Sequence, residues 1–257
     1  MEHLAALISP LAPCLCGFMT CYDSRVVWVA DNADSYDMPH AVALTIDDVP
    51  RKNTTIKDVR DIMNLLNHFD AKATFFVFFD QLNVIDSDVR APVVREFIKL
   101  VNAGGHELGV HFKGRWGHQM LLAELDVGIE QSLELARNKF GMDVKFLRMP
   151  GGFSTPAQVT LIEESHGLTV VNGTAYPGDA DVCKCLSALA LGRCAGRLAN
   201  SDGRIAILHD DRRLLAKVCS FLEQLQVQDK RAITLRKLLG HKPIAMSNSF
   251  IPMLMPL

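Results

Sequence analysis

The chain has 257 residues, of which 49% are hydrophobic and 22% are charged, and its formal net charge is -2. This composition supports a large buried core and excludes an intrinsically disordered chain, and the length fits one large α/β domain or two small ones. A pI near 6.5 and the lack of any lysine- or arginine-rich run argue against a nucleic-acid partner.

The N-terminal segment resembles a signal sequence only in part. Residues 4–22 carry no charged side chain, but Pro10 and Pro13 interrupt the stretch, and Glu2 stands where a signal peptide has basic residues. The same prolines disfavour a membrane-spanning helix. We expect no membrane span, and we favour a cytoplasmic protein over a secreted one in which residues 1–22 act as a cryptic signal.

The seven cysteines show no spacing typical of a disulfide framework or a zinc site. Free, buried thiols in a reducing compartment fit this pattern better.

Short apolar runs alternate along the chain with amphipathic stretches of helical spacing. We expect strands over 25–30, 41–47, 73–79, 106–111, 145–149, 168–172, 204–208 and 231–235. Between them we expect helices over 58–69, over a segment containing 94–101, and over 121–140, 155–165, 183–199 and 214–225, with a short last helix after the last strand.

This strict alternation implies parallel strands joined by right-handed crossovers. About seven strand–helix units follow residue 41, which fits a closed (β/α) barrel. We expect the barrel over 41–240, after an N-terminal extension over 1–40 and before an irregular tail over 241–257. An open doubly wound sheet is the alternative, although no GxGxxG motif follows the first long strand.

Titratable side chains gather where the expected strands end, or just beyond. They are Asp47 and Asp48, His111, Arg148, Asp179 and His209. Adjacent carboxylates after a buried strand are costly unless they are paired or bind a metal, and like charges separate the proton affinities of the two groups. Because β/α barrels build active sites at the carboxyl ends of their strands, this constellation predicts an active site.

Short motifs around these residues occur in the order found in one known family. They read TIDDVP (45–50), GHELGVH (105–111), FLRMPGG (146–152), YPGD (176–179) and ILHD (207–210). The ordered set resembles the polysaccharide deacetylase family, a carbohydrate esterase type built on the NodB homology domain. The chain looks like a divergent member from about residue 41 to about residue 240. The resemblance implies a distorted (β/α) barrel with seven strands.

The resemblance also implies a role for each matching residue. Asp47 would be the catalytic base, with Arg148 orienting it. His209 would be the general acid, with Asp179 tuning its proton affinity. The base would take a proton from the water that attacks an acetamide carbonyl, and the acid would protonate the departing amine.

A divalent metal, with zinc as the expected ion, is implied in the same way. Asp48 and His111 match two of its ligands, but the position of the second metal histidine, four residues after the first, is Arg115 here. His118 is the nearest substitute. It would lie about 10.5 Å from His111 along a continuous helix, so it can join the site only if the chain bends.

Four further residues are assigned to substrate binding by the resemblance. They are Leu208, which would line an apolar pocket for the acetyl methyl group, and Pro150, Gly151 and Tyr176. A glycine of the RMPGG motif stands where the family often has an aromatic residue, and two tryptophans and three tyrosines leave few stacking surfaces for sugar rings. These departures favour a small or modified substrate over long chitin chains.

Three functions therefore stay open. The first is a hydrolase of C–N bonds that deacetylates an N-acetylated sugar or polysaccharide. The second is a metal-independent amidase of a small amide. The third is a catalytically inactive pseudoenzyme that binds carbohydrate or a protein partner. The sequence does not specify the oligomeric state.

Overall fold

The computed structural model describes residues 25–27, 40–85, 87–114, 116–173, 205–211 and 213–240. The expected tail over 241–257, the expected helix over 183–199 and most of the expected N-terminal extension lie outside these residues.

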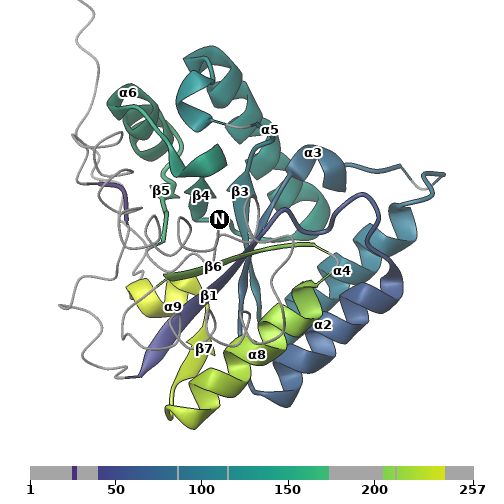
Figure 1. The fold of residues 1–257 in the computed structure, drawn as a ribbon. Helices are drawn as coiled ribbons and strands as arrows, with labels where there is room; N and C mark the ends of the chain where they lie inside the picture. The colour runs from purple at the N-terminus through teal and green to yellow at the C-terminus, as the bar shows by residue number, and fades with distance from the viewer. Residues whose placement is uncertain are drawn as a thin grey trace, which may run out of the picture.

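Seven parallel strands form one sheet in the described part of the chain. They are β1 (Ala41–Asp47), β2 (Thr74–Val77), β3 (Glu107–His111), β4 (Phe146–Arg148), β5 (Thr169–Val170), β6 (Ile205–His209) and β7 (Arg231–Ile233). Their order is β5-β4-β3-β2-β1-β6, and β7 pairs with the beginning of β1 (Figure 1). The sheet is a curled half-barrel with helices around it, so the expected α/β barrel of about seven parallel strands is confirmed.

Helices surround the sheet, mostly on its outer face. They are α2 (Ile56–His68), α3 (Phe79–Leu82), α4 (Ala91–Gly104), α5 (Leu122–Phe140), α6 (Pro156–Thr160), α8 (Leu214–Val227) and α9 (Leu235–Leu239), with short turns η2 (Gly117–Gln119), η3 (Pro150–Gly152) and η4 (Leu161–Ser165). Helix α2 packs between α4 and α8 (Figure 1). It begins with a capping box in which Thr55 and Asp58 satisfy each other's backbone N–H groups.

The second strand is shorter than its sequence predicts. The expected strand over 73–79 stops at Val77, and Phe79 already belongs to α3. A continuous apolar run cannot by itself distinguish a buried strand from the buried helix turn that follows it. The expected lead-in strand is described only at 25–27, where Val27 forms a bridge to Val171 beside β5.

The alternating direction of side chains along the strands separates two apolar clusters on opposite faces of the sheet. On β1, Val42, Leu44 and Ile46 pack against the helices, whereas Ala41 and Ala43 belong to a smaller cluster on the inner face of the sheet. Successive side chains of a strand point to opposite faces, so the inner face of β1 continues through Thr45 to Asp47. The fold thus places the first of the predicted catalytic residues inside the barrel.

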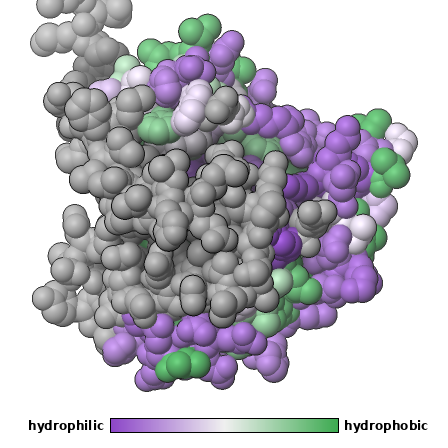
Figure 2. Space-filling view, in the orientation of Figure 1, coloured by the Kyte–Doolittle hydropathy of each residue, from purple (hydrophilic) through white to green (hydrophobic). Residues whose placement is uncertain are grey.

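The outward faces of the helices are polar. On the side formed by α2, α3 and α4, Figure 2 shows mainly hydrophilic side chains with scattered apolar ones. Among the described residues, no helix is both long and apolar enough to cross a membrane.

Candidate active site

A buried ion pair joins two strands that are not neighbours. Asp47 ends β1 and Arg148 ends β4, and the order of the sheet places β2 and β3 between them. In a flat sheet that separation would be about 14 Å, since strands lie about 4.8 Å apart. Nevertheless Arg148 Nη1 donates a hydrogen bond to Asp47 Oδ1 at 2.6 Å. The curl of the sheet therefore creates the pair.

Arg148 is fixed on every side. Its guanidinium also donates to Thr45 Oγ1 at 2.8 Å and to the carbonyl oxygens of Val171 and Asn172, both at 3.2 Å. The group lies 4.2 Å from the centre of the Phe76 ring, at the distance of a cation–π contact. Burial lowers the pKa of Arg148 from its ordinary value, while the neighbouring carboxylate opposes that shift. This network holds one orientation of the guanidinium and thereby of Asp47.

His209 lies on the other side of Asp47. It ends β6, which is the direct neighbour of β1, and the two residues are in register. The His209 Nε2 atom is 3.8 Å from Asp47 Oδ2. The histidine side chain is 16% exposed against 3% for the aspartate, so a substrate can reach the imidazole. A carboxylate and an accessible imidazole at this separation are suited to share a proton-transfer reaction.

Asp48 turns away from the strand and faces His111. Its φ of +67° is uncommon for a residue with a side chain, and its N–H donates to the carbonyl of Phe76. The His111 Nδ1 atom lies 2.7 Å from the carbonyl oxygen of Arg148, which fixes the proton on that nitrogen. In the neutral imidazole Nε2 is then left as an acceptor; it lies 3.7 Å from Asp48 Oδ1, and the Phe78 ring stacks on the imidazole.

Two of the ligands expected for a metal ion are therefore close together. The backbone hydrogen bond to Nδ1 is the arrangement that orients a metal-binding histidine. Among the described residues, however, no three His, Cys, Asp or Glu side chains form a group that could hold one ion, so His118 does not join Asp48 and His111. Zinc sites use at least three protein ligands. The described residues thus fit a divalent ion only incompletely.

The other predicted residues have different positions. Leu208 is 2% exposed and packs in the cluster between sheet and helices, on the face of β6 opposite to His209. The structure does not place it beside the reactive groups, because adjacent residues of a strand point to opposite faces. Pro150 is buried directly after β4, while Gly151 is exposed with a φ of +65°.

Three predicted positions have no structural description. Asp179 and Tyr176 lie outside the described residues, so their assigned roles stay predictions, and Arg115, at the position of the family's second metal histidine, lies outside them as well.

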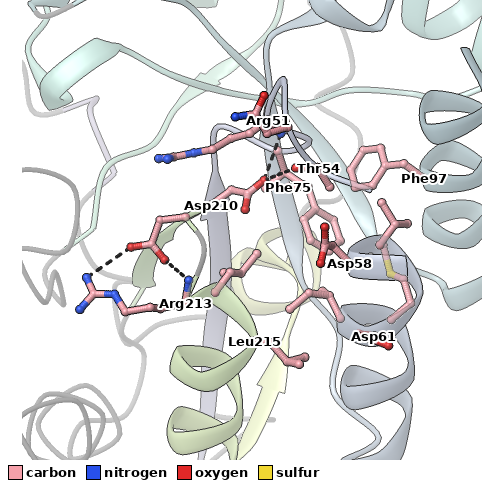
Figure 3. A pocket seen from close by; sticks show the side chains of 16 residues that line it. Arg51, Thr54, Asp58, Asp61, Phe75, Phe97, Asp210, Arg213 and Leu215 are labelled. Carbon is pink, nitrogen blue, oxygen red and sulfur yellow. Dashed lines mark hydrogen bonds and ion pairs between the residues drawn. The ribbon is translucent and has the colours of Figure 1, made fainter. Parts of the chain in front are cut away.

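One buried carboxylate was missed by the sequence analysis. Asp210 accepts hydrogen bonds from the Arg51 N–H at 3.0 Å and from the Thr54 hydroxyl at 3.1 Å (Figure 3). Its own N–H donates to the carbonyl of Asp47. Burial raises the pKa of Asp210 above its ordinary value, and these hydrogen bonds oppose the shift. Asp210 ties the loop after Asp48 to the strand end that carries His209. Its place in the ILHD motif was the available signal.

A cavity of about 630 Å³ adjoins this carboxylate (Figure 3). Its lining includes Ile62, Met63 and Phe75, which belong to the cluster under the helices. The cavity therefore lies on the helix side of the sheet and not on the inner face that carries Asp47.

A curled parallel sheet with a buried Asp–Arg pair, a buried histidine and an accessible histidine at its carboxyl edge defines a β/α barrel with a hydrolase-like site. The sequence model of the polysaccharide deacetylase family matches residues 35–171. The chain belongs to that family. No curated protein sequence matches it.

Solved structures of the same fold resemble the chain at low identity. A chitin deacetylase from the fungal pathogen Colletotrichum lindemuthianum has a TM-score of 0.66 and 21% identity, covering 85% of this chain and 92% of that one. A family 4 acetyl xylan esterase from Clostridium thermocellum, solved with a cobalt ion, has a TM-score of 0.62 and 22% identity, covering 78% and 90%.

A third structure is a pseudoenzyme of family CE4 from Bacillus anthracis. Its TM-score is 0.64 at 17% identity, and the match covers 79% of this chain and 66% of that one. At these identities the likeness establishes the shared fold.

Proposed function

We propose that the protein hydrolyses the C–N bond of an N-acetylated sugar and releases acetate. The observation that carries this proposal is the buried Asp47, held at 2.6 Å by Arg148 and 3.8 Å from the accessible His209. Family membership and the deacetylases of the same fold support it. A carbohydrate substrate and a cytoplasmic location are part of the same proposal.

The geometry gives each group a task. Asp47, whose negative charge is compensated by Arg148, takes a proton from a water molecule as its oxygen attacks the acetamide carbonyl. Protonated His209 gives its proton to the amine nitrogen as the C–N bond breaks. The products are acetate and a free amine. Return of the captured proton from Asp47 to His209 restores both groups; their 3.8 Å separation requires one bridging water molecule for this transfer.

Acetate release from tetra-N-acetyl-chitotetraose by the purified chain tests this proposal. Because general base catalysis contributes about 10²–10⁴ in rate, Asp47→Asn should lower kcat by about that factor. His209→Gln should give a comparable loss. Since Asp47 is also half of a buried ion pair, thermal unfolding of each variant controls for folding. Equal activity of wild type and folded variants would contradict the assignment.

For the metal we propose that Asp48 and His111 would hold a divalent ion, with zinc as the expected metal. Enzymes of this family generally use a divalent metal. Two protein donors predict a site weaker than one with three. Metal content measured after equilibration with zinc should fall to background in both Asp48→Ala and His111→Ala. Unchanged metal content in these variants would exclude Asp48 and His111 as donors. A metal-free wild type that still releases acetate would favour the metal-independent amidase.

The second candidate function is carbohydrate binding without catalysis. The incomplete ligand group favours it, and a pseudoenzyme is among the structures of the same fold. Binding of chitotetraose without acetate release from any acetylated substrate would support this alternative.

A further inference from the structure

The loops that follow β3 and β4 are packed tightly on each other. A Cβ atom at Gly117 would lie 2.3 Å from the carbonyl oxygen of Phe153 and 2.9 Å from Cβ of Met149. The buried Gln158 side chain donates to the carbonyls of Gly117 and Met120 at 3.0 and 2.8 Å. Residues flanking Gly117 are therefore held on a rigid surface.

Three rings meet where these loops touch. The Trp116 ring centre lies 5.0 Å from that of Phe153 and 6.4 Å from that of His118, and the last two rings are 5.8 Å apart and perpendicular. Trp116 is 36% exposed, and it is the one aromatic residue among the exposed large hydrophobic side chains of the described segments. Phe153 and His118 thus contact an indole that still presents surface to solvent.

This ring cluster belongs to the reactive edge of the sheet. One loop leaves the strand that ends at His111, and the other leaves the strand that ends at Arg148. These two strands are neighbours, and the two terminal residues are in register. The ring cluster therefore lies at the same edge of the sheet as Asp47 and His209.

We infer that Trp116, supported by Phe153, is a stacking surface for a pyranose ring next to the sugar that reacts. The inference rests on the proposed function and specifies its substrate as an N-acetylated oligosaccharide. A sugar ring presents a face of C–H groups, which packs on the electron-rich face of an indole without desolvating its hydroxyl groups. A rigid indole loses little conformational entropy when the ring binds.

The test uses the full chain with Asp47→Asn, so that ligand is bound but not consumed. The probes are tetra-N-acetyl-chitotetraose and the N-acetylglucosamine monosaccharide. The sequence contains two tryptophans, Trp28 and Trp116, so adding Trp28→Phe leaves Trp116 as the only indole fluorophore. Its emission should change as the tetrasaccharide is added. Trp116→Ala should weaken tetrasaccharide binding about tenfold, as expected for the loss of an aromatic contact worth about 1.4 kcal/mol, and Trp116→Phe by less.

Controls separate stacking from a packing role. Trp28→Phe should leave tetrasaccharide affinity unchanged, and Trp116→Ala should keep its cooperative thermal transition. Calorimetric titration gives the affinities independently of fluorescence. An unchanged tetrasaccharide affinity in Trp116→Ala would overturn the inference, as would an equal loss for the monosaccharide and the tetrasaccharide.

Acetate release distinguishes the two proposals. If wild type releases acetate and Trp116→Ala binds and reacts equally well, the inference fails and the proposed function stands. If wild type releases none, but Trp116→Ala loses tetrasaccharide binding, stacking stands and the deacetylase proposal fails. If the wild type shows neither tetrasaccharide binding nor acetate release, both proposals are overturned.

Discussion

A single side chain, Arg148, organises the inner face of the barrel. It bonds the end of β1 through Asp47 and Thr45 and the segment after β5 through Val171 and Asn172. Removing one member of a buried ion pair leaves an uncompensated charge and costs about 3–5 kcal/mol. The residues that position the proposed base thus also stabilise the curled sheet, so folding controls must accompany their activity assays.

A second buried residue predicts how stability depends on pH. His106 is 7% exposed, its Nδ1 accepts from the N–H of Ala73 at 3.2 Å, and its Nε2 has no hydrogen-bond partner in the described structure. Burial lowers the pKa of His106 from 6.5 to about 4, and Lys72 adds to the shift. The unfolded chain therefore binds a proton more readily than the folded one. The contribution of neutral His106 to the free energy of unfolding is full above pH 6.5 and is lost as the pH falls toward 4.

The expected loss from this histidine is up to about 3 kcal/mol, at 1.36 kcal/mol per pKa unit. Urea denaturation between pH 4.5 and 7.5 measures it. His106→Asn keeps an acceptor for Ala73 and should flatten this part of the profile. The matched control is His68→Asn at an exposed position, which should leave it unchanged. The same pH slope in His106→Asn as in wild type would refute this explanation.

At the scale of elements, close contact between β2 and β3 determines the space around the site. A Cβ atom at Gly109 of β3 would lie 2.5 Å from the Phe76 ring of β2. That ring lies in turn 4.2 Å from the guanidinium of Arg148. A glycine in the middle of a strand often marks such a close approach. The absence of a side chain at 109 leaves room for the aromatic surface on which Arg148 lies.

We therefore expect Gly109→Ala to push the Phe76 ring toward Arg148. Overpacking of this kind costs about 1–3 kcal/mol in unfolding free energy, and displacement of Arg148 should lower kcat as well. Chemical denaturation and acetate release measure the two effects. Adding Phe76→Leu frees space and should recover part of the stability. A fully stable and active Gly109→Ala would show that the strand can shift without consequence for the site.

At the scale of the whole molecule, α9, the last helix of the described residues, ties the end of the described chain to the middle strands. Arg236 of α9 donates from Nε to Glu107 Oε1 of β3 at 2.9 Å, and Glu107 also accepts from the Thr74 hydroxyl of β2. The Leu235 N–H donates to the same Thr74 oxygen at 2.9 Å. These bonds form at the amino-terminal end of the sheet, opposite to the reactive edge. They hold α9 against β2 and β3 and so stabilise the fold.

Arg236→Ala should lower the free energy of unfolding by about 1–3 kcal/mol, because a buried carboxylate loses a charged donor. The matched control is Arg60→Ala, which removes an ion pair of similar length, 2.7 Å to Glu96, from a more exposed arginine. That change should cost less than Arg236→Ala, because solvent screens an exposed ion pair. Thermal and urea unfolding of both variants give the comparison, and equal losses would count against a special role for Glu107.

The sequence by itself determined the alternation of strands and helices, the seven-stranded parallel fold and the positions of Asp47, His111, Arg148 and His209 at strand ends. Local periodicity and the order of short motifs carry that information. The sequence also determined on which face of the sheet Leu208 lies, since a residue next to His209 on a strand points to the opposite face.

Only the tertiary structure decided which of these groups meet. The 2.6 Å bond between Arg148 and Asp47 depends on how far the sheet curls, and the separation of His118 from Asp48 and His111 depends on the path of one loop. The bonds of Asp210 to Arg51 and Thr54 likewise join segments far apart in the chain. Such contacts depend on the packing of the whole barrel, because no local pattern records the distance between two strand ends.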